Sequence, residues 1–140
     1  MEMYVPQGGP PQGEGPSHEI YGIMGADNIY KMCDDFYQEL EKSSIRALFS
    51  DDMKAASRKI AIFLIGLLGG PPLYHQTYGP PQMRRRHMGF AIDEQARQVW
   101  LGCFKKTLEG ADKKYNFPEE HLSGFVQFLE DFSAWMVNRQ

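Results

Sequence analysis

The sequence predicts an all-α fold. Apolar residues recur every three or four positions through several long stretches, and no stretch alternates convincingly between apolar and polar residues. Capping residues such as Ser and Asp open these stretches, and clusters of Gly and Pro close them. The 140 residues suit one domain with a sizeable apolar core. We therefore expect about five helices and no sheet.

The first residues of the chain differ from the rest. Residues 1–18 are dominated by Pro, Gly and Gln and show no apolar periodicity. Such a segment cannot bury enough apolar surface to offset its conformational entropy. We predict a disordered tail over residues 1–18, with Tyr4 and Val5 as candidates for local docking, and one domain over residues 19–140.

Two long helices are expected in the first half of the domain. The first is capped by Asp27 and runs to about Lys42. A short helical turn opens at Ser43, Ser50 caps the second long helix, and residues 69–72 (Gly-Gly-Pro-Pro) end it. The residues expected to face inward are Ile29, Met32, Cys33, Phe36, Tyr37, Leu40, Ile45, Leu48, Phe49, Ala56, Ile60, Phe63, Leu64 and Leu67.

The second half is expected to begin with a loop. Residues 71–83 are rich in turn formers, and residues 82–88 suit a short helix. Asp93 caps a long helix, and the last helix opens at Asn116, with Pro in its first turn. The inward-facing residues of the two long helices would be Ala96, Val99, Trp100, Cys103, Phe104, Leu108, Leu122, Phe125, Val126, Leu129, Phe132 and Met136.

Composition excludes several classes of partner. The net charge of −3 provides no electrostatic basis for binding nucleic acid or anionic lipid. The longest apolar run, residues 60–70, is about half the roughly 20 residues of a membrane helix, and no export signal is visible. Two cysteines fit a reducing compartment. We expect a cytoplasmic protein with neither nucleic acid nor membrane as its partner.

The four histidines are candidates for a metal ligand. His18 lies in the predicted tail, His121 in the first turn of the last helix, and His75 in a loop flanked by Gly and Pro. His87 follows three arginines and precedes Met88 and Phe90. This segment therefore combines an imidazole, cations and apolar groups, and haem requires all three, for its iron, its propionates and its macrocycle.

Taken alone, this segment also fits a solvated basic turn. Aromatic residues make up 13% of the chain and Met adds eight more polarisable side chains, which fits an aromatic-rich core as well as a pocket for a flat ligand. No HExxH, CxxC, GxSxG or P-loop pattern indicates hydrolase or nucleotide chemistry. The segment around His87 is therefore the one candidate for chemistry.

An ordered set of motifs resembles one protein family. The motifs, in chain order, are Phe36-Tyr37, Phe63-Leu64, Gly69-Gly70-Pro71 with Tyr74, residues 83–90 (MRRRHMGF) and Trp100-Leu101. Over residues 19–137 the chain resembles the truncated haemoglobins, and a tryptophan thirteen residues after the histidine is similar to group II. The resemblance implies a sandwich of two helices over two, with haem b (iron protoporphyrin IX) as cofactor.

The resemblance also implies roles for individual residues. His87 would be the proximal iron ligand, with its other ring nitrogen bonded to a backbone carbonyl or water. Tyr37 and Trp100 would donate hydrogen bonds to the gas ligand on the distal side, where Ala56 would face the iron. The remaining haem contacts would be Lys59, Arg84 and Arg86 at the propionates, and Phe49, Ile60, Phe63, Tyr74 and Phe90 along the apolar walls.

Three positions depart from the family pattern. Gly25 is followed by Ala26 in place of a second glycine, and Phe49 occupies the position of a second distal tyrosine in several group II members. The stretch between Tyr37 and Met53 is shorter than in some relatives. The register of the following helix is therefore open by one residue, which would place Ala55 or Ser57 at the iron in place of Ala56.

The implied function is the binding of O2, NO and CO at a haem iron with an open coordination position. Oxygen transport, NO oxidation and peroxide chemistry all remain open at this point, as does enzymatic activity. A reductase would be a further partner, and the chain would be a monomer or homodimer. The alternative is a cofactor-free helical interaction module that binds a partner through residues 84–86 or the Pro-rich tail.

Overall fold

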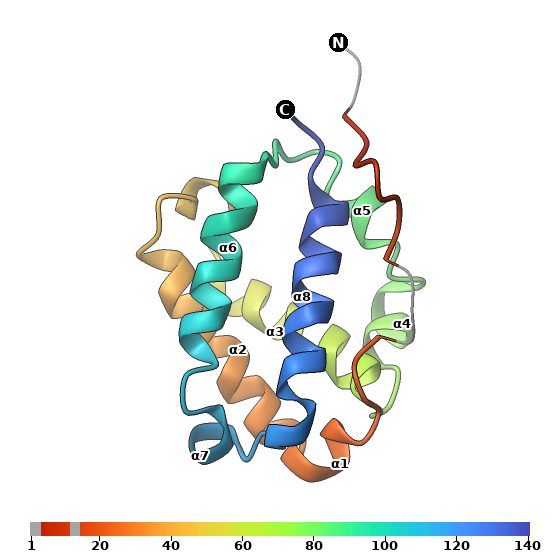
Figure 1. Ribbon diagram of the computed structural model, residues 1–140, viewed down its shortest axis with the longest axis vertical. Helices are drawn as coiled ribbons and strands as arrows, with labels where there is room; N and C mark the ends of the chain where they lie inside the picture. The colour runs from red at the N-terminus through yellow and green to blue at the C-terminus, as the bar shows by residue number, and fades with distance from the viewer. Residues whose placement is uncertain (1–3, 12–14) are drawn as a thin grey trace.

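Two layers of two helices build the fold. The computed structural model describes residues 4–11 and 15–140, and all regular structure within them is helical (Figure 1). Helices α2 (Ala26–Glu41) and α3 (Met53–Leu67) pack together and cross α6 (Glu94–Thr107) and α8 (Leu122–Met136). The predicted all-α class and its two-over-two arrangement are therefore confirmed.

Short helices connect these four. In the described part of the chain they are α1 (Ile20–Met24), η1 (Arg46–Leu48), α4 (Leu73–Tyr78), α5 (Met83–Arg86), α7 (Ala111–Tyr115) and η2 (Glu119–His121). The prediction of a loop over residues 71–83 is wrong for its first part, because α4 lies within it. Six residues are too few to show apolar periodicity, so the sequence pattern could not reveal this helix.

The starts of the long helices confirm one predicted cap and correct another. The carboxylate of Asp93 accepts a hydrogen bond from the amide of Ala96 at 2.8 Å, as expected of a cap. At the start of α3, Asp52 accepts from the amide of Ala55 at 3.0 Å, so the cap is Asp52 and not Ser50.

The caps predicted at Asp27 and Asn116 are also wrong. Helix α2 begins directly after Gly25, whose φ of 78° suits glycine, and Asp27 lies in the first turn, where its charge favours the positive helix end. Asn116 ends α7, and its side chain donates to the carbonyl of Ile23 at 2.9 Å. The last α-helix begins only at Leu122, after η2.

The end of α3 requires a glycine, as predicted. Gly69 has a φ of 104°, and a Cβ atom built there would lie 1.9 Å from the carbonyl oxygen of His18. Because the backbone at His18 passes so close to Gly69, the amide of Tyr21 can donate to the carbonyl of Leu68 at 2.9 Å. This contact anchors α1 against the end of α3.

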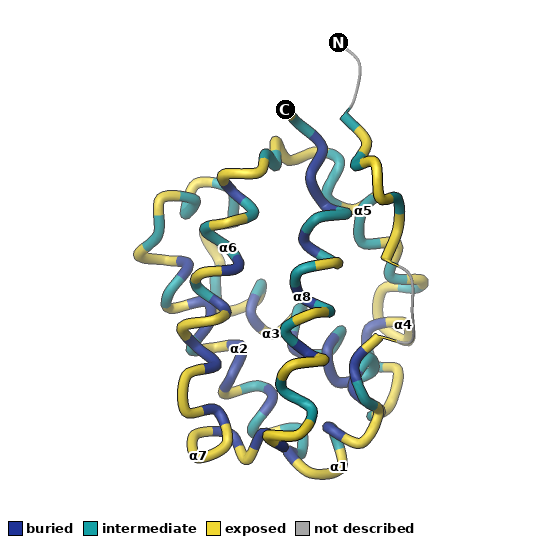
Figure 2. Tube along the Cα trace, in the orientation of Figure 1, coloured by how far each residue is buried: buried dark blue, intermediate teal, exposed yellow. Residues whose placement is uncertain are grey.

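The core lies between the two layers, and α3 has two apolar faces. The buried face of α2 is the predicted one, and Figure 2 shows buried stretches along α2 and α8 facing the interior. The fully buried residues of α3 are Ser57, Ala61, Leu64 and Ile65. The inward-facing residues predicted for this helix were therefore only partly right, because Ala56, Ile60 and Phe63 are half-buried and line a cavity instead.

Part of the predicted tail contacts the domain. Residues 1–3 and 12–14 lie outside the described residues, and disorder over residues 1–18 stays a prediction. The carbonyl of Tyr4 accepts a hydrogen bond from Arg84 at 2.9 Å, and Pro16 is buried. No helix in the described part of the chain is long and apolar enough to cross a membrane.

Candidate functional site

A cavity of about 460 Å³ lies among the four long helices and the short helices α4 and α5. Its lining is mostly aliphatic and aromatic. All predicted site residues except Arg84 line it, namely Tyr37, Phe49, Ala56, Lys59, Ile60, Phe63, Tyr74, Arg86, His87, Phe90 and Trp100. This volume is in the range of cofactor pockets. The fold thus brings the predicted residues together around one space, while their roles toward a cofactor stay predictions.

His87 is the one histidine in this lining. It follows the last residue of α5, and its Nδ1 donates to the carbonyl oxygen of Met83 at 2.6 Å. The same oxygen accepts the backbone N–H of His87 at 3.1 Å, so ring and backbone are tied to one turn. Because a carbonyl can only accept, Nδ1 carries the proton of the neutral ring and Nε2 keeps a free lone pair. The predicted bond to a backbone carbonyl is therefore confirmed.

Phe36 positions Tyr37 and Trp100, the two predicted distal donors. Its ring is fully buried and stands perpendicular to the rings of Tyr37 and Trp100, with centroids 5.4 Å away in both cases. No described residue hydrogen-bonds the Tyr37 hydroxyl or the Trp100 indole nitrogen, so both donors are free toward the cavity. Burial raises the pKa of the Tyr37 phenol well above its ordinary value, which keeps its proton in place for donation.

The register of α3 decides which of its small residues line the cavity. Ala55 and Ala56 both line the cavity. Ser57 is buried on a different face, where its hydroxyl donates to Oδ1 of Asp34 at 2.7 Å. The alternative that placed the Ser57 hydroxyl in the cavity is therefore excluded, and the side chains that α3 contributes at positions 55 and 56 are methyl groups.

Two cations stand at the rim of the cavity. The ammonium of Lys59 lies 4.6 Å from the ring centroid of Tyr78, and the guanidinium of Arg86 lies 5.3 Å from that of Tyr74. Arg86 also donates to the carbonyls of Tyr78, Pro80 and Pro81, which anchors it. Neither cation forms an ion pair with a described residue. Their charges are therefore available to an anionic group at this edge.

The predicted contact of Arg84 with a haem propionate is wrong. Its guanidinium lies outside the cavity, donates to the carbonyls of Trp135 and Val137, and stacks 4.5 Å from the Trp135 ring centroid. The end of a helix leaves carbonyls without partners, and a cation is favoured there. The end of α8 therefore holds Arg84, which cannot at the same time reach a haem propionate in the cavity.

Sequence reasoning missed several lining residues. The principal ones are Ile45, Leu48, Ile92, Ala96, Arg97, Phe132, Ser133 and Met136. Arg97 forms an ion pair with Glu94 at 2.6 Å and donates from Nε to the Ser133 hydroxyl at 3.0 Å, so this cation is already committed. The pattern Glu94–Arg97 at helical spacing indicates only a surface pair, so nothing in the sequence marked Arg97 as a cavity residue.

The comparisons with known proteins agree with this geometry. Residues 19–138 match the family model of the bacterial-like globins. The chain belongs to this globin family. The group 2 truncated haemoglobin YjbI of Bacillus subtilis (strain 168) is 32% identical over 109 residues, which cover 74% of this chain and 83% of that protein. A globin fold implies a haem cofactor and the binding of a diatomic gas such as oxygen.

Solved structures support the same assignment. Phosphate-bound Hell's gate globin IV is 36% identical to this globin with a TM-score of 0.83, over 92% of this chain and 80% of that one. The truncated oxygen-avid haemoglobin from Bacillus subtilis is 29% identical with a TM-score of 0.77, over 84% of this chain and 98% of that one. The group II truncated haemoglobin from Bacillus anthracis is 28% identical with a TM-score of 0.78, over 86% and 95%. The resemblance to group II truncated haemoglobins is therefore confirmed.

Proposed function

We propose that this globin holds haem b in the 460 Å³ cavity, with Nε2 of His87 as the proximal iron ligand, and that it binds O2, NO and CO on the opposite side. The observation that carries the proposal is the hydrogen bond from Nδ1 of His87 to the Met83 carbonyl. It fixes the tautomer that leaves Nε2 able to coordinate a metal, and it raises the basicity of that nitrogen.

The remaining cavity residues fit the other parts of the cofactor. When bound, haem supplies an iron atom that takes a diatomic ligand reversibly. Lys59 and Arg86 have unpaired charges at the rim and suit the two propionates. The aromatic and aliphatic walls would pack against the macrocycle, with Phe63 and Tyr74 in an edge contact at 5.9 Å and Phe90 at 6.2 Å from the His87 ring.

Tyr37 and Trp100 are the proposed distal donors. Both lie in the cavity lining with an O–H or N–H that no described residue uses. A donor fixed in a dry site strengthens as negative charge develops on a diatomic ligand, so the pair favours slow ligand release. Slow release suits scavenging or ligand chemistry better than bulk oxygen transport. The relative from Bacillus subtilis that is described as oxygen-avid supports this proposal.

The alternative of a cofactor-free interaction module is less well supported. Arg84 is bound by the end of α8, and Arg86 by three loop carbonyls. Of residues 84–86, only Arg85 has no hydrogen-bonding partner in the described part of the chain. Arg84 is therefore committed to an internal contact, and Arg86 lines the cavity, so residues 84–86 do not form one free basic surface. Both cysteines are free thiols, which supports a cytoplasmic location.

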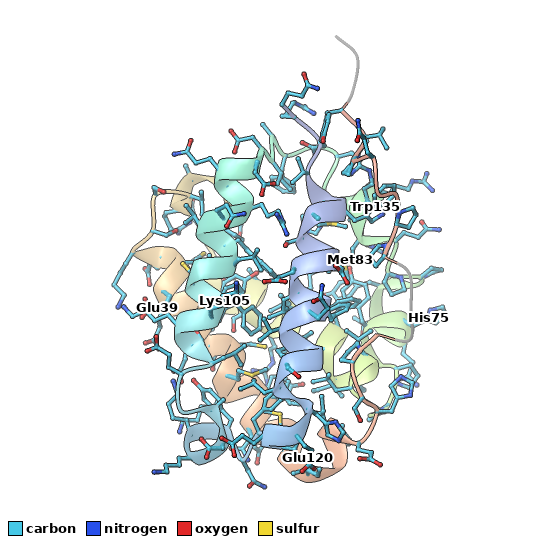
Figure 3. All side chains as sticks on the ribbon, in the orientation of Figure 1. Glu39, His75, Met83, Lys105, Glu120 and Trp135 are labelled. Carbon is cyan, nitrogen blue, oxygen red and sulfur yellow. The ribbon has the colours of Figure 1, made fainter. Side chains whose placement is uncertain are left out.

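Hemin titration tests the proposal. We expect the folded protein to take up one equivalent of hemin with a strong Soret band, and the band to shift when dithionite and CO are added. His87→Ala should abolish the normal CO spectrum, whereas His75→Ala should not, because His75 lies on α4 outside the cavity lining (Figure 3). A folded protein that refuses hemin would contradict the proposal and favour the interaction module.

A further inference from the structure

Asn138 is a polar residue with no exposed surface. It lies just after α8, and its side-chain Nδ2 donates to the carbonyls of His87 at 3.2 Å and Phe90 at 2.9 Å. Its Oδ1 accepts from the amide of Ile92 at 2.9 Å, and its own amide donates to the Ile92 carbonyl at 2.9 Å. Both ends of the buried side-chain amide are thus fully used, and all four bonds reach one segment.

That segment is the loop between α5 and α6. Residues 87–92 form turns and extended backbone rather than a helix, and within this segment one backbone hydrogen bond forms, from the amide of Phe90 to the carbonyl of His87 at 3.0 Å. Asn138 bonds the loop near its start, middle and end, at His87, Phe90 and Ile92. The backbone conformation that carries the His87 ring therefore depends on a residue that lies 51 positions later in the sequence.

The helix before His87 is attached to the same region. Arg84 donates to the carbonyls of Trp135 and Val137, and Figure 1 shows α5 beside the end of α8. Figure 3 places Trp135 at that end of α8, close to Met83 of α5. Helix α5 has four residues, and a helix of one turn is unstable without tertiary contacts. It therefore needs this external anchor to hold its position.

We infer that Arg84 and Asn138 are positioning residues for His87. Residues 135–138 act as a clamp that holds the Arg84 side chain before this histidine and the backbone at and after it, and so fixes the position and tilt of the His87 ring. The inference rests on the proposed function, because the ring is positioned for an iron atom. Arg84 thus has a role toward the cofactor other than the predicted contact with a propionate.

Variants at Asn138 test the clamp. Asn138→Ala removes every side-chain bond, whereas Asn138→Asp keeps the acceptor for Ile92 but loses both donors. Asn28→Ala is the matched control, since it removes one bond from an asparagine side chain to the Met24 carbonyl, at the start of α2. Arg84→Lys is a milder second variant that stays testable if Asn138→Ala does not fold.

The readouts are the iron–histidine stretching band in resonance Raman spectra of the ferrous protein and the rate of haem transfer to apomyoglobin. We expect both Asn138 variants and Arg84→Lys to shift or broaden the iron–histidine band. Asn138→Ala should also accelerate haem loss by about tenfold or more. The control Asn28→Ala should match the wild-type protein in both readouts. Wild-type band position and transfer rate in all folded clamp variants would overturn the inference. Absence of the band from the wild-type protein would instead contradict the proposed function.

Discussion

At the scale of single residues, the proposed distal chemistry depends on two side chains held by a third. Phe36 stands edge-on to both Tyr37 and Trp100 and is completely buried, so close packing holds all three rings. The rings are therefore fixed before any ligand enters. A fixed donor does not have to lose rotational freedom when the ligand arrives, which makes its hydrogen bond more effective.

Replacing the distal donors should speed ligand release. A hydrogen bond to a charged group contributes about 1.5–3 kcal/mol, so Trp100→Phe or Tyr37→Phe should each raise the O2 dissociation rate by about 10- to 100-fold. Stopped-flow mixing of the oxygenated protein with dithionite would measure this rate. Tyr74→Phe is the control, because it removes a hydroxyl from another aromatic residue of the cavity lining. Unchanged rates in both donor variants would reject the distal assignment.

Sequence reasoning works well for residues whose neighbours are close in the chain or fixed by a pattern. The resemblance to the truncated haemoglobins, carried by the motifs around Tyr37, His87 and Trp100, predicted that these residues share one site, and all three line the same cavity. Arg84 and Asn138 could not be assigned this way. Their partners lie about half the chain away, and only the packing of α8 beside α5 brings them together.

At the scale of the elements, α3 shows how one helix serves two purposes. Ser57 and Ala61 face the core, whereas Ala56 and Ile60 face the cavity. Its apolar surface is therefore wider than a core alone requires, and the excess forms a wall of the site. Periodicity predicted the long helices correctly, but it did not distinguish these two faces, since both are apolar.

The cap of α3 provides a stability test. Asp52→Ala should lower the free energy of unfolding by about 1 kcal/mol, because the amide of Ala55 loses its partner at the helix start. Ser50→Ala should have almost no effect, since Ser50 lies outside the helix. Urea unfolding followed by circular dichroism would measure both values. A larger loss for Ser50→Ala than for Asp52→Ala would contradict the observed cap.

At the scale of the whole molecule, buried phenols and a buried thiol make the free energy of unfolding depend on pH in the alkaline range. Burial raises the pKa of Tyr37, Tyr115 and Cys33, and a hydrogen bond to Asp35 adds to the effect at Tyr115. The unfolded chain therefore loses these protons first as pH rises. The contribution of these groups to the free energy of unfolding is therefore greatest at neutral pH. It falls as the pH rises above the ordinary pKa values of 9.0 for Cys and 10.0 for Tyr.

We therefore expect the free energy of unfolding to be lower at about pH 10.5 than at about pH 8, with a slope reduced by Tyr37→Phe. Denaturant titrations of the protein at the two pH values would measure the difference. Tyr78→Phe serves as the control, because Tyr78 is exposed. The account would be contradicted by a Tyr37→Phe variant with the wild-type pH dependence.

The arrangement of the whole molecule explains how a short sequence builds this site. The crossing of two helix pairs creates the cavity, and α5 with its following loop places His87 in its wall. This arrangement could be predicted from the sequence through the order of the motifs. The short helices α4 and α7 could not, because six and five residues are too few for a periodic pattern.

The most direct test of the central claim is rescue of the proximal ligand. In His87→Gly the absorption spectra of the ferrous and CO-bound haem protein should change, and added imidazole should restore the wild-type spectra by filling the space of the lost ring. Glycine is tolerated at this position because His87 lies just after the last residue of α5 and not inside a helix. Wild-type spectra in His87→Gly without imidazole would show that another group binds the iron, and the account would then be wrong.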